Sequence, residues 1–306
     1  MTKFSERVRR FGLAAAVAAS AAAFVGASSQ AQDARVLYER GLAALHLFEY
    51  EDANDAFLQA QRADPGFAMG YWGEAMTYNQ TLWRKEDVAA ARQALARLAP
   101  SPAARAAKAA NMTEKGLLAA VDLLFGDGDA AARHRQYAEA MARVHAADPA
   151  DPDVASLYAL ALLGTMSRSL IGHGDNADVH EGRTQGLAGS QVQSRVSAIL
   201  GAVLKSHPEH AGALHYLIHN DDDPEHARLA LDAARTLTRI APDSSHARHM
   251  PSHVFLQLGM WRDAEAADRS AFAASQAWVT RRNLGPAVRN YHALAWLQYA
   301  LLQRGR

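Results

Sequence analysis

Apolar positions recur every three or four residues along most of the chain, and no stretch alternates apolar and polar residues for more than a few positions. The first spacing is typical of amphipathic α-helices, and the lack of alternation argues against β-strands. Alanine and leucine, both strong helix formers, dominate these segments. Prolines interrupt them at points such as Asp64-Pro65, Ala99-Pro100, Asp148-Pro149 and Ala241-Pro242. The sequence therefore predicts an all-α protein.

The predicted helices come in pairs joined by short polar turns, which indicates helix hairpins. These hairpins run from Arg35 to Pro65, Phe67 to Pro100, Asn111 to Pro149, Glu209 to Pro242 and Ser245 to about Ser275. A further pair joins residues 153–164 to residues 190–206 across a polar, glycine-rich interruption at about 165–189, which is either a lid or a disordered insertion. A last helix, Ala287 to Arg304, has no predicted partner and is expected to act as a cap.

The first 31 residues differ from the rest of the chain. Four basic residues precede an uncharged, alanine-rich run over residues 11–27, and Ser29-Gln30-Ala31 supplies the small residues that a signal peptidase reads. We predict an export signal over residues 1–31, so that residues 32–306 form the mature protein in the periplasm or outside the cell. A membrane anchor is the alternative, but the run is shorter than the ~20 residues of a spanning helix. The pair Arg9-Arg10 leaves open whether export follows the general or the twin-arginine route.

Charge and cysteine content narrow the classes of function. The 306 residues hold 32 basic and 32 acidic side chains. The predicted signal contains four of the basic and one of the acidic residues, so the remainder carries 28 and 31, and we expect no nucleic-acid partner and no membrane span after signal removal. No cysteine is present, so packing has to replace disulfides, and any bound metal must use imidazole, carboxylate, amide or phenol ligands.

The first hairpin carries a family resemblance. Small residues at Gly41 and Ala53, the aromatic Phe57, and the final Asp64-Pro65 resemble the tetratricopeptide repeat. The resemblance implies an α-solenoid of antiparallel helix hairpins, whose concave groove is lined by the first helix of each hairpin and binds a peptide, a protein or a small ligand. Four segments also resemble a group of exported bacterial tetratricopeptide proteins with a histidine-rich motif: YWGEAMTYN, GALHYLIH, DDPEHA and HARHMPSHVFLQLGMW.

Eight of the 14 histidines lie between positions 207 and 261. On a helix, His215 and His219 are about 40° and 6 Å apart, so they share a face. Similarly, His246, His249 and His253 advance by three and then four residues and form one stripe. The resemblance places both sets on the groove side of successive hairpins. We therefore expect the five imidazoles to converge into one cluster.

Such a cluster suits a transition metal, because two imidazoles four residues apart on a helix are held in position for one ion. Zinc, copper, iron and nickel all accept imidazole, and the sequence does not choose among them. Pro251 is expected to bend the second stripe. The remaining ring N–H groups need acceptors, and the candidates nearby in sequence are Asp221, Asp222, Asp223, Glu225 and Asp243.

Other side chains are predicted to face the same groove. Glu74 is a candidate general base or carboxylate ligand, and Tyr291 a candidate catalytic partner. Tyr78, Trp83 and His292 are candidate ligand-binding residues. Two functions remain open: a groove that binds a peptide, protein or small ligand through its histidines, or a metal-binding protein or metalloenzyme that uses the five-histidine cluster.

Overall fold

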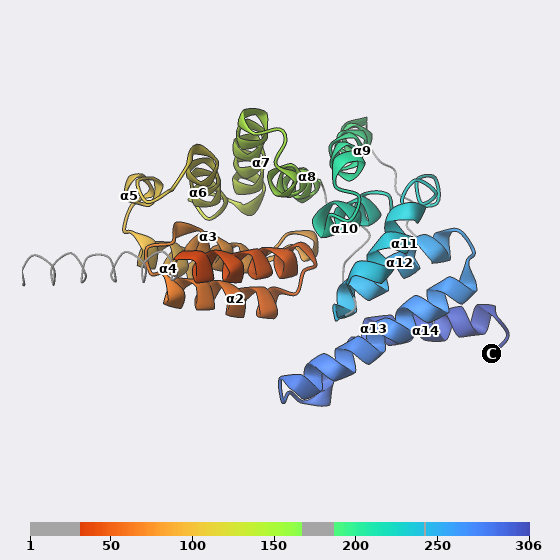
Figure 1. Ribbon diagram of the computed structural model, residues 1–306. Coiled ribbons are helices and arrows are strands. Elements are labelled where there is room, and N and C mark those ends of the chain that lie inside the picture. The colour runs from red at the N-terminus through yellow and green to blue at the C-terminus, as the bar shows by residue number, and fades with distance from the viewer. Residues whose placement is uncertain (1–30, 167–186, 242) are drawn as a thin grey trace, which may run out of the picture.

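A computed structural model describes residues 31–166, 187–241 and 243–306 (Figure 1). Over these residues the regular secondary structure is helical apart from two strands of two residues each, which confirms the all-α prediction. The predicted export signal, except Ala31, and most of the polar interruption lie outside the described residues. No helix within the described part is long and apolar enough to cross a membrane.

The first helices pack closely because two glycines face one aromatic ring. A helix over residues 31–46 is followed by α2 (Tyr50–Ala63), α3 (Ala68–Thr77) and α4 (Val88–Leu98). A Cβ atom on Gly41 would lie 2.7 Å from the ring of Phe57, and one on Gly73 would collide with the same ring. The chain turns before α2 at Phe48, which has a positive φ of 59° and a buried ring.

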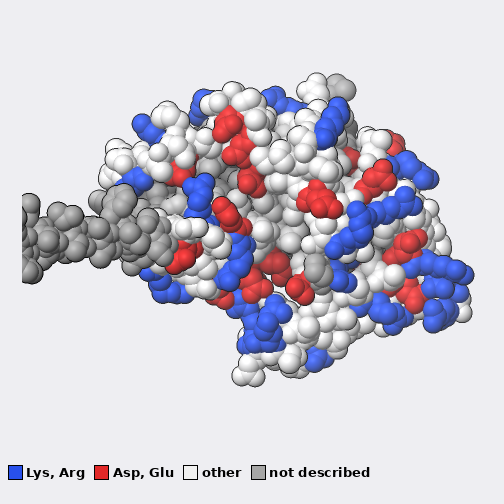
Figure 2. Space-filling model, in the orientation of Figure 1, with Lys and Arg blue, Asp and Glu red and all other residues white. Residues whose placement is uncertain are grey.

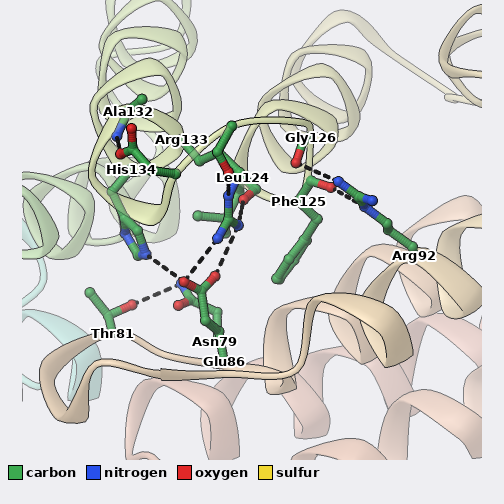
Figure 3. Close-up of polar contacts among 12 residues, drawn as sticks. Asn79, Thr81, Glu86, Arg92, Leu124, Phe125, Gly126, Ala132, Arg133 and His134 are labelled. Atoms are coloured by element: carbon green, nitrogen blue, oxygen red, sulfur yellow. Dashed lines mark hydrogen bonds and ion pairs between the residues drawn. The ribbon is translucent and has the colours of Figure 1, made fainter.

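A small β-hairpin interrupts the second helix pair, between α3 and α4. Strand β1 (Asn79–Gln80) and strand β2 (Lys85–Glu86) pair antiparallel around the 3-10 turn η1 (Thr81–Trp83). Strands of two residues are too short to produce an alternating apolar–polar pattern, and the all-α prediction stands. Figure 3 shows how Glu86 anchors this hairpin through Arg133, whose two terminal nitrogens each lie 3.0 Å from a carboxylate oxygen of Glu86.

The middle of the chain continues as consecutive packed helices, which are α5 (Pro102–Ala106), α6 (Met112–Leu124), α7 (Ala130–Ala147), α8 (Pro152–Thr165) and α9 (Leu187–Ser206). Side chains that accept a backbone N–H start several of them, including Asn111 before α6, Asp129 before α7 and Asp151 before α8. The hairpin tip is tied to the end of α8, because Arg84 donates to the carbonyls of Gly164 and Met166.

The histidine-rich part forms the last helices, which are α10 (Ala211–Asn220), α11 (Leu231–Ile240), α12 (Ser245–Gln257), α13 (Trp261–Arg281) and α14 (Tyr291–Gln303). The turn η3 (Pro286–Val288) precedes α14. Helix α12 continues through Pro251. The ring of Pro251 removes the N–H that would bond to the carbonyl of Ala247.

Both ends of the helical array contact each other. The guanidinium of Arg282, just after α13, donates to Asp52 at 2.5 Å and to Asp55 at 2.6 Å on α2, and the indole of Trp278 donates to Asp52. One hydrophobic cluster runs through the array from Leu42 to Ala300. On the face seen in Figure 2, basic and acidic side chains lie interspersed. The turn before α2 lies against α10 and α12, because Phe48 packs on His215 and His246.

Candidate metal centre

The first histidine group, trio A, consists of His215 and His219 on α10 and His246 on α12. The Nε2 atom of His219 lies 3.1 Å from Nε2 of His215 and 3.4 Å from Nε2 of His246. A tetrahedral ion with metal–nitrogen bonds of 2.0–2.1 Å holds its ligands about 3.3 Å apart. The three nitrogens therefore have the spacing of ligands to a single ion.

A backbone acceptor fixes the protonation of His215. Its Nδ1 lies 2.7 Å from the carbonyl oxygen of His46, and a carbonyl can only accept, so Nδ1 carries the hydrogen. The lone pair of His215 is then on Nε2, the atom that faces His219. Burial lowers the pKa of His215 to about 4, so the ring is neutral at physiological pH. His215 thus presents a neutral ring whose acceptor nitrogen faces His219.

Aromatic rings surround trio A. The ring centroid of Phe48 lies 4.5 Å from that of His215 and 5.6 Å from those of His219 and His246. Trp83, from the β-hairpin insertion, lies with its ring centroid 5.1 Å from that of His246. The structure therefore places Trp83, a predicted ligand-binding residue, in the wall of trio A.

The second group, trio B, consists of His249 and His253 on α12 and His292 on α14. The Nε2 atoms of His249 and His253 are 3.0 Å apart, and one ligand atom from each of the three rings lies within 4.8 Å of the others. Trp296, one turn after His292, packs its ring 4.2 Å from that of His253. His292 is exposed, so trio B opens to solvent on its side.

Two buried carboxylates hold the outer nitrogens of trio B. Nδ1 of His249 lies 2.6 Å from Asp268 on α13, and Nδ1 of His253 lies 2.9 Å from Asp222, just after α10. With both carboxylates ionised, both Nδ1 atoms are donors, so the two Nε2 atoms present lone pairs to each other at 3.0 Å. Burial raises the pKa of Asp268 to about 8, which makes a proton available to this chain of contacts. The two Nε2 atoms can therefore share one proton, or both face a metal ion once Asp268 is ionised.

A third group, trio C, combines His46, Asp153 and His210, but its hydrogen bonds are complete. Nδ1 of His210 accepts the backbone N–H of Ala213 at the start of α10, so its hydrogen is on Nε2, which donates to Asp153 at 3.0 Å. Nε2 of His46 lies 2.8 Å from the same oxygen, and Nδ1 of His46 lies 3.0 Å from the hydroxyl of Tyr216. Although burial acts to raise the pKa of Asp153, the bonds from the two histidines hold it below its usual value. Trio C is a hydrogen-bonded support, and the backbone of His46 in turn orients His215.

The five histidines expected in one cluster are divided between two trios. His246 joins the α10 pair, whereas His249 and His253 turn toward α14 and meet His292. The reason is geometric: three residues along a helix change the direction of a side chain by about 60°, enough for α12 to serve two sites. Asp222 is one of the acceptors expected from the sequence. Asp268 was not expected, because it lies on the following helix, 19 residues from His249. Trp296 is four residues after His292 and shares its helix face.

The other predicted site residues lie outside both trios. Glu74, on α3, is buried and accepts from Gln61 at 2.6 Å and from Arg97, while the hydroxyl of Tyr78 lies 3.5 Å from it. Tyr291 is 47% exposed, and its hydroxyl donates to the carbonyl of Pro286. The structure therefore gives Glu74 a charge-paired position between helices and Tyr291 a local contact before α14.

Comparisons with known protein families and curated proteins do not identify a relative of this chain. No protein-family model matches the chain, and no curated protein matches it. The case for function therefore rests on the residues themselves.

Proposed function

We propose that the protein binds transition-metal ions at trio A and trio B. The observation that carries this proposal is the pair of opposed Nε2 atoms in each trio, 3.1 Å apart in trio A and 3.0 Å apart in trio B. In both trios a hydrogen-bond acceptor on Nδ1 turns the Nε2 lone pair of a buried histidine toward its neighbour. Metal-ligating histidines are typically held in this way by a carbonyl or a carboxylate.

Burial favours metal binding over a peptide-binding groove. The exposed fractions of His215, His219, His249 and His253 are 0%, 5%, 1% and 3%. Side chains that hydrogen-bond a peptide have to be accessible to it, whereas a metal ion reaches its ligands through a much smaller opening. The partly buried His246 and the exposed His292 are the points where each trio meets solvent.

Three imidazoles leave room for chemistry at the ion. Zinc and copper both accept three nitrogen ligands, and a four-coordinate ion then keeps one position for water or a substrate. Because the chain has no cysteine, thiolate ligation is excluded. We propose zinc, copper or iron as the bound metal, with the fourth position as the place where an added ligand would bind.

We also propose that the scaffold is a tetratricopeptide-like solenoid and that the protein is exported. The packing of each helix from α6 to α14 on the next one supports the first proposal, as does the close approach of helices at Gly41 and Gly73. The basic residues, the alanine-rich run and the small residues at Ser29-Gln30-Ala31 support the second.

Elemental analysis of the untagged protein, purified without chelators and then offered zinc or copper, tests the metal proposal. We expect two ions per chain in the parent and one each in His215→Ala/His219→Ala and His249→Ala/His253→Ala. Combining all four substitutions should leave none. His207→Ala is the matched control, because His207 is exposed at a helix end and belongs to neither trio. Circular dichroism checks that each variant remains helical.

Two results would contradict the proposal. The first is a parent protein that takes up neither zinc nor copper. The second is a metal content that does not change when either histidine pair is removed, since the bound ions would then be held elsewhere. Either result would favour the alternative function, a groove that binds a peptide.

A further inference from the structure

Trio B differs from an ordinary three-histidine site because two carboxylates contact the outer nitrogens of its histidines. Asp268 and Asp222 lie on separate elements, α13 and the turn after α10, and each approaches the Nδ1 atom of a different histidine. Both side chains are buried, with exposed fractions of 1% for Asp268 and 8% for Asp222. The Oδ2 atom of Asp268 is also buried without a hydrogen-bond partner. A metal at the Nε2 atoms would therefore have carboxylates directly across two of its ligand rings.

We infer that Asp268 and Asp222 tune trio B for a divalent cation and against a monovalent one. This inference rests on the proposed metal binding. The attraction between an ionised carboxylate and a bound ion is proportional to the charge of the ion, so each Asp, once ionised, favours a 2+ ion twice as strongly as a 1+ ion. Burial makes this difference larger, because little water lies between the charges to screen them.

The hydrogen bonds from the histidines to these carboxylates also favour a divalent ion. An imidazole that donates from Nδ1 to a carboxylate becomes a more basic ligand at Nε2, and strong basic donors favour the more highly charged ion. In trio A, by contrast, Nδ1 of His215 donates to the neutral carbonyl of His46. Zn²⁺ is the suitable divalent probe and Cu⁺ the suitable monovalent one, since imidazole binds both metals.

The test removes the negative charge but keeps the acceptor. Asp268→Asn and Asp222→Asn each leave a carbonyl oxygen facing Nδ1, so the histidines keep an orienting partner. Both are made in the full chain with trio A disabled by His215→Ala/His219→Ala, and affinities for Zn²⁺ and Cu⁺ are measured by chelator competition, the latter without oxygen. Asp263→Asn is the matched control, because Asp263 is an exposed acid on the same helix as Asp268.

We expect each substitution to lower the Zn²⁺ affinity about 10- to 100-fold, the range found when such outer partners are removed. The Cu⁺ affinity should fall by a much smaller factor, and Asp263→Asn should change neither. If both affinities fall equally, the carboxylates only orient the rings, and the inference is wrong. It is also wrong if neither affinity changes.

Failure of this inference is distinguishable from failure of the proposed function. A chain in which trio B binds neither ion contradicts the metal site itself, whereas equal losses for the two ions contradict only the charge preference. Since Asp268 and Asp222 come from different elements, one variant still gives an answer if the other does not fold. Unfolding of each metal-free variant by urea identifies such a case.

Discussion

Two buried polar clusters of this protein differ in how their atoms are paired. Around Glu86, each donor faces an acceptor: Arg133 meets both oxygens of the carboxylate and the carbonyl of Leu124 (Figure 3). In trio B, nitrogen faces nitrogen, because His249 and His253 turn Nε2 atoms toward each other. In the first cluster every one of these contacts pairs a donor with an acceptor, whereas the two Nε2 atoms of the second can share a proton or face one metal ion. This difference is why we propose a structural role for the cluster around Glu86 and metal binding for trio B.

The largest effect is expected from breaking the cluster around Glu86. Glu86→Ala leaves the guanidinium of Arg133, whose side chain is 7% exposed, without its counter-charge. Removing one partner of a buried ion pair costs about 3 kcal/mol or more of folding free energy. Urea unfolding measures this loss, and the metal content of the folded variant should equal that of the parent. A change in metal content would show that the β-hairpin also shapes trio A.

A smaller effect, on binding rather than on stability, is expected at trio B. His292→Ala removes the exposed ligand and leaves the buried pair intact. We expect the metal affinity of trio B to fall about 10- to 100-fold, or about 1.4–2.7 kcal/mol. The stability of the metal-free protein should change by less than about 0.5 kcal/mol, since His292 lies at the surface. Chelator competition and urea unfolding measure the two quantities, and an unchanged affinity would remove His292 from the site.

Trio C contains residue types that bind metals, but the ring nitrogens of its two histidines already have hydrogen-bond partners. His210→Ala removes the side chain that accepts the N–H of Ala213 and donates to Asp153. Loss of a helix-capping acceptor costs about 1–2 kcal/mol. Thermal unfolding should show this loss, while two metals per chain remain bound. If the parent binds a third ion and this variant loses it, trio C is a metal site as well.

The sequence predicted the helices well because their signals are local. Apolar spacing and proline positions are read from neighbouring residues. The starts of α2, α6 and α12 could therefore be placed from the residues at and before each helix. It also found the two histidine pairs, since four-residue spacing fixes a shared helix face. The division into two trios was not predictable, because it depends on the direction in which α12 meets α10 and α14. Contacts between distant residues, such as Asp268 with His249 or Phe48 with His215, leave no local pattern.

The smallest expected effect is on tryptophan fluorescence, which reports on the two trios separately. Trp83 lies against His246 of trio A and Trp296 against His253 of trio B, so Cu²⁺ at either trio should quench the nearby indole. In Trp83→Phe, the part of the quenching that comes from trio A should disappear and the rest remain. Trp296→Phe should show the reverse, with each exchange costing less than about 1.5 kcal/mol in stability. Equal quenching in both variants and the parent would mean that copper binds away from these indoles, and the assignment of the two sites would then be wrong.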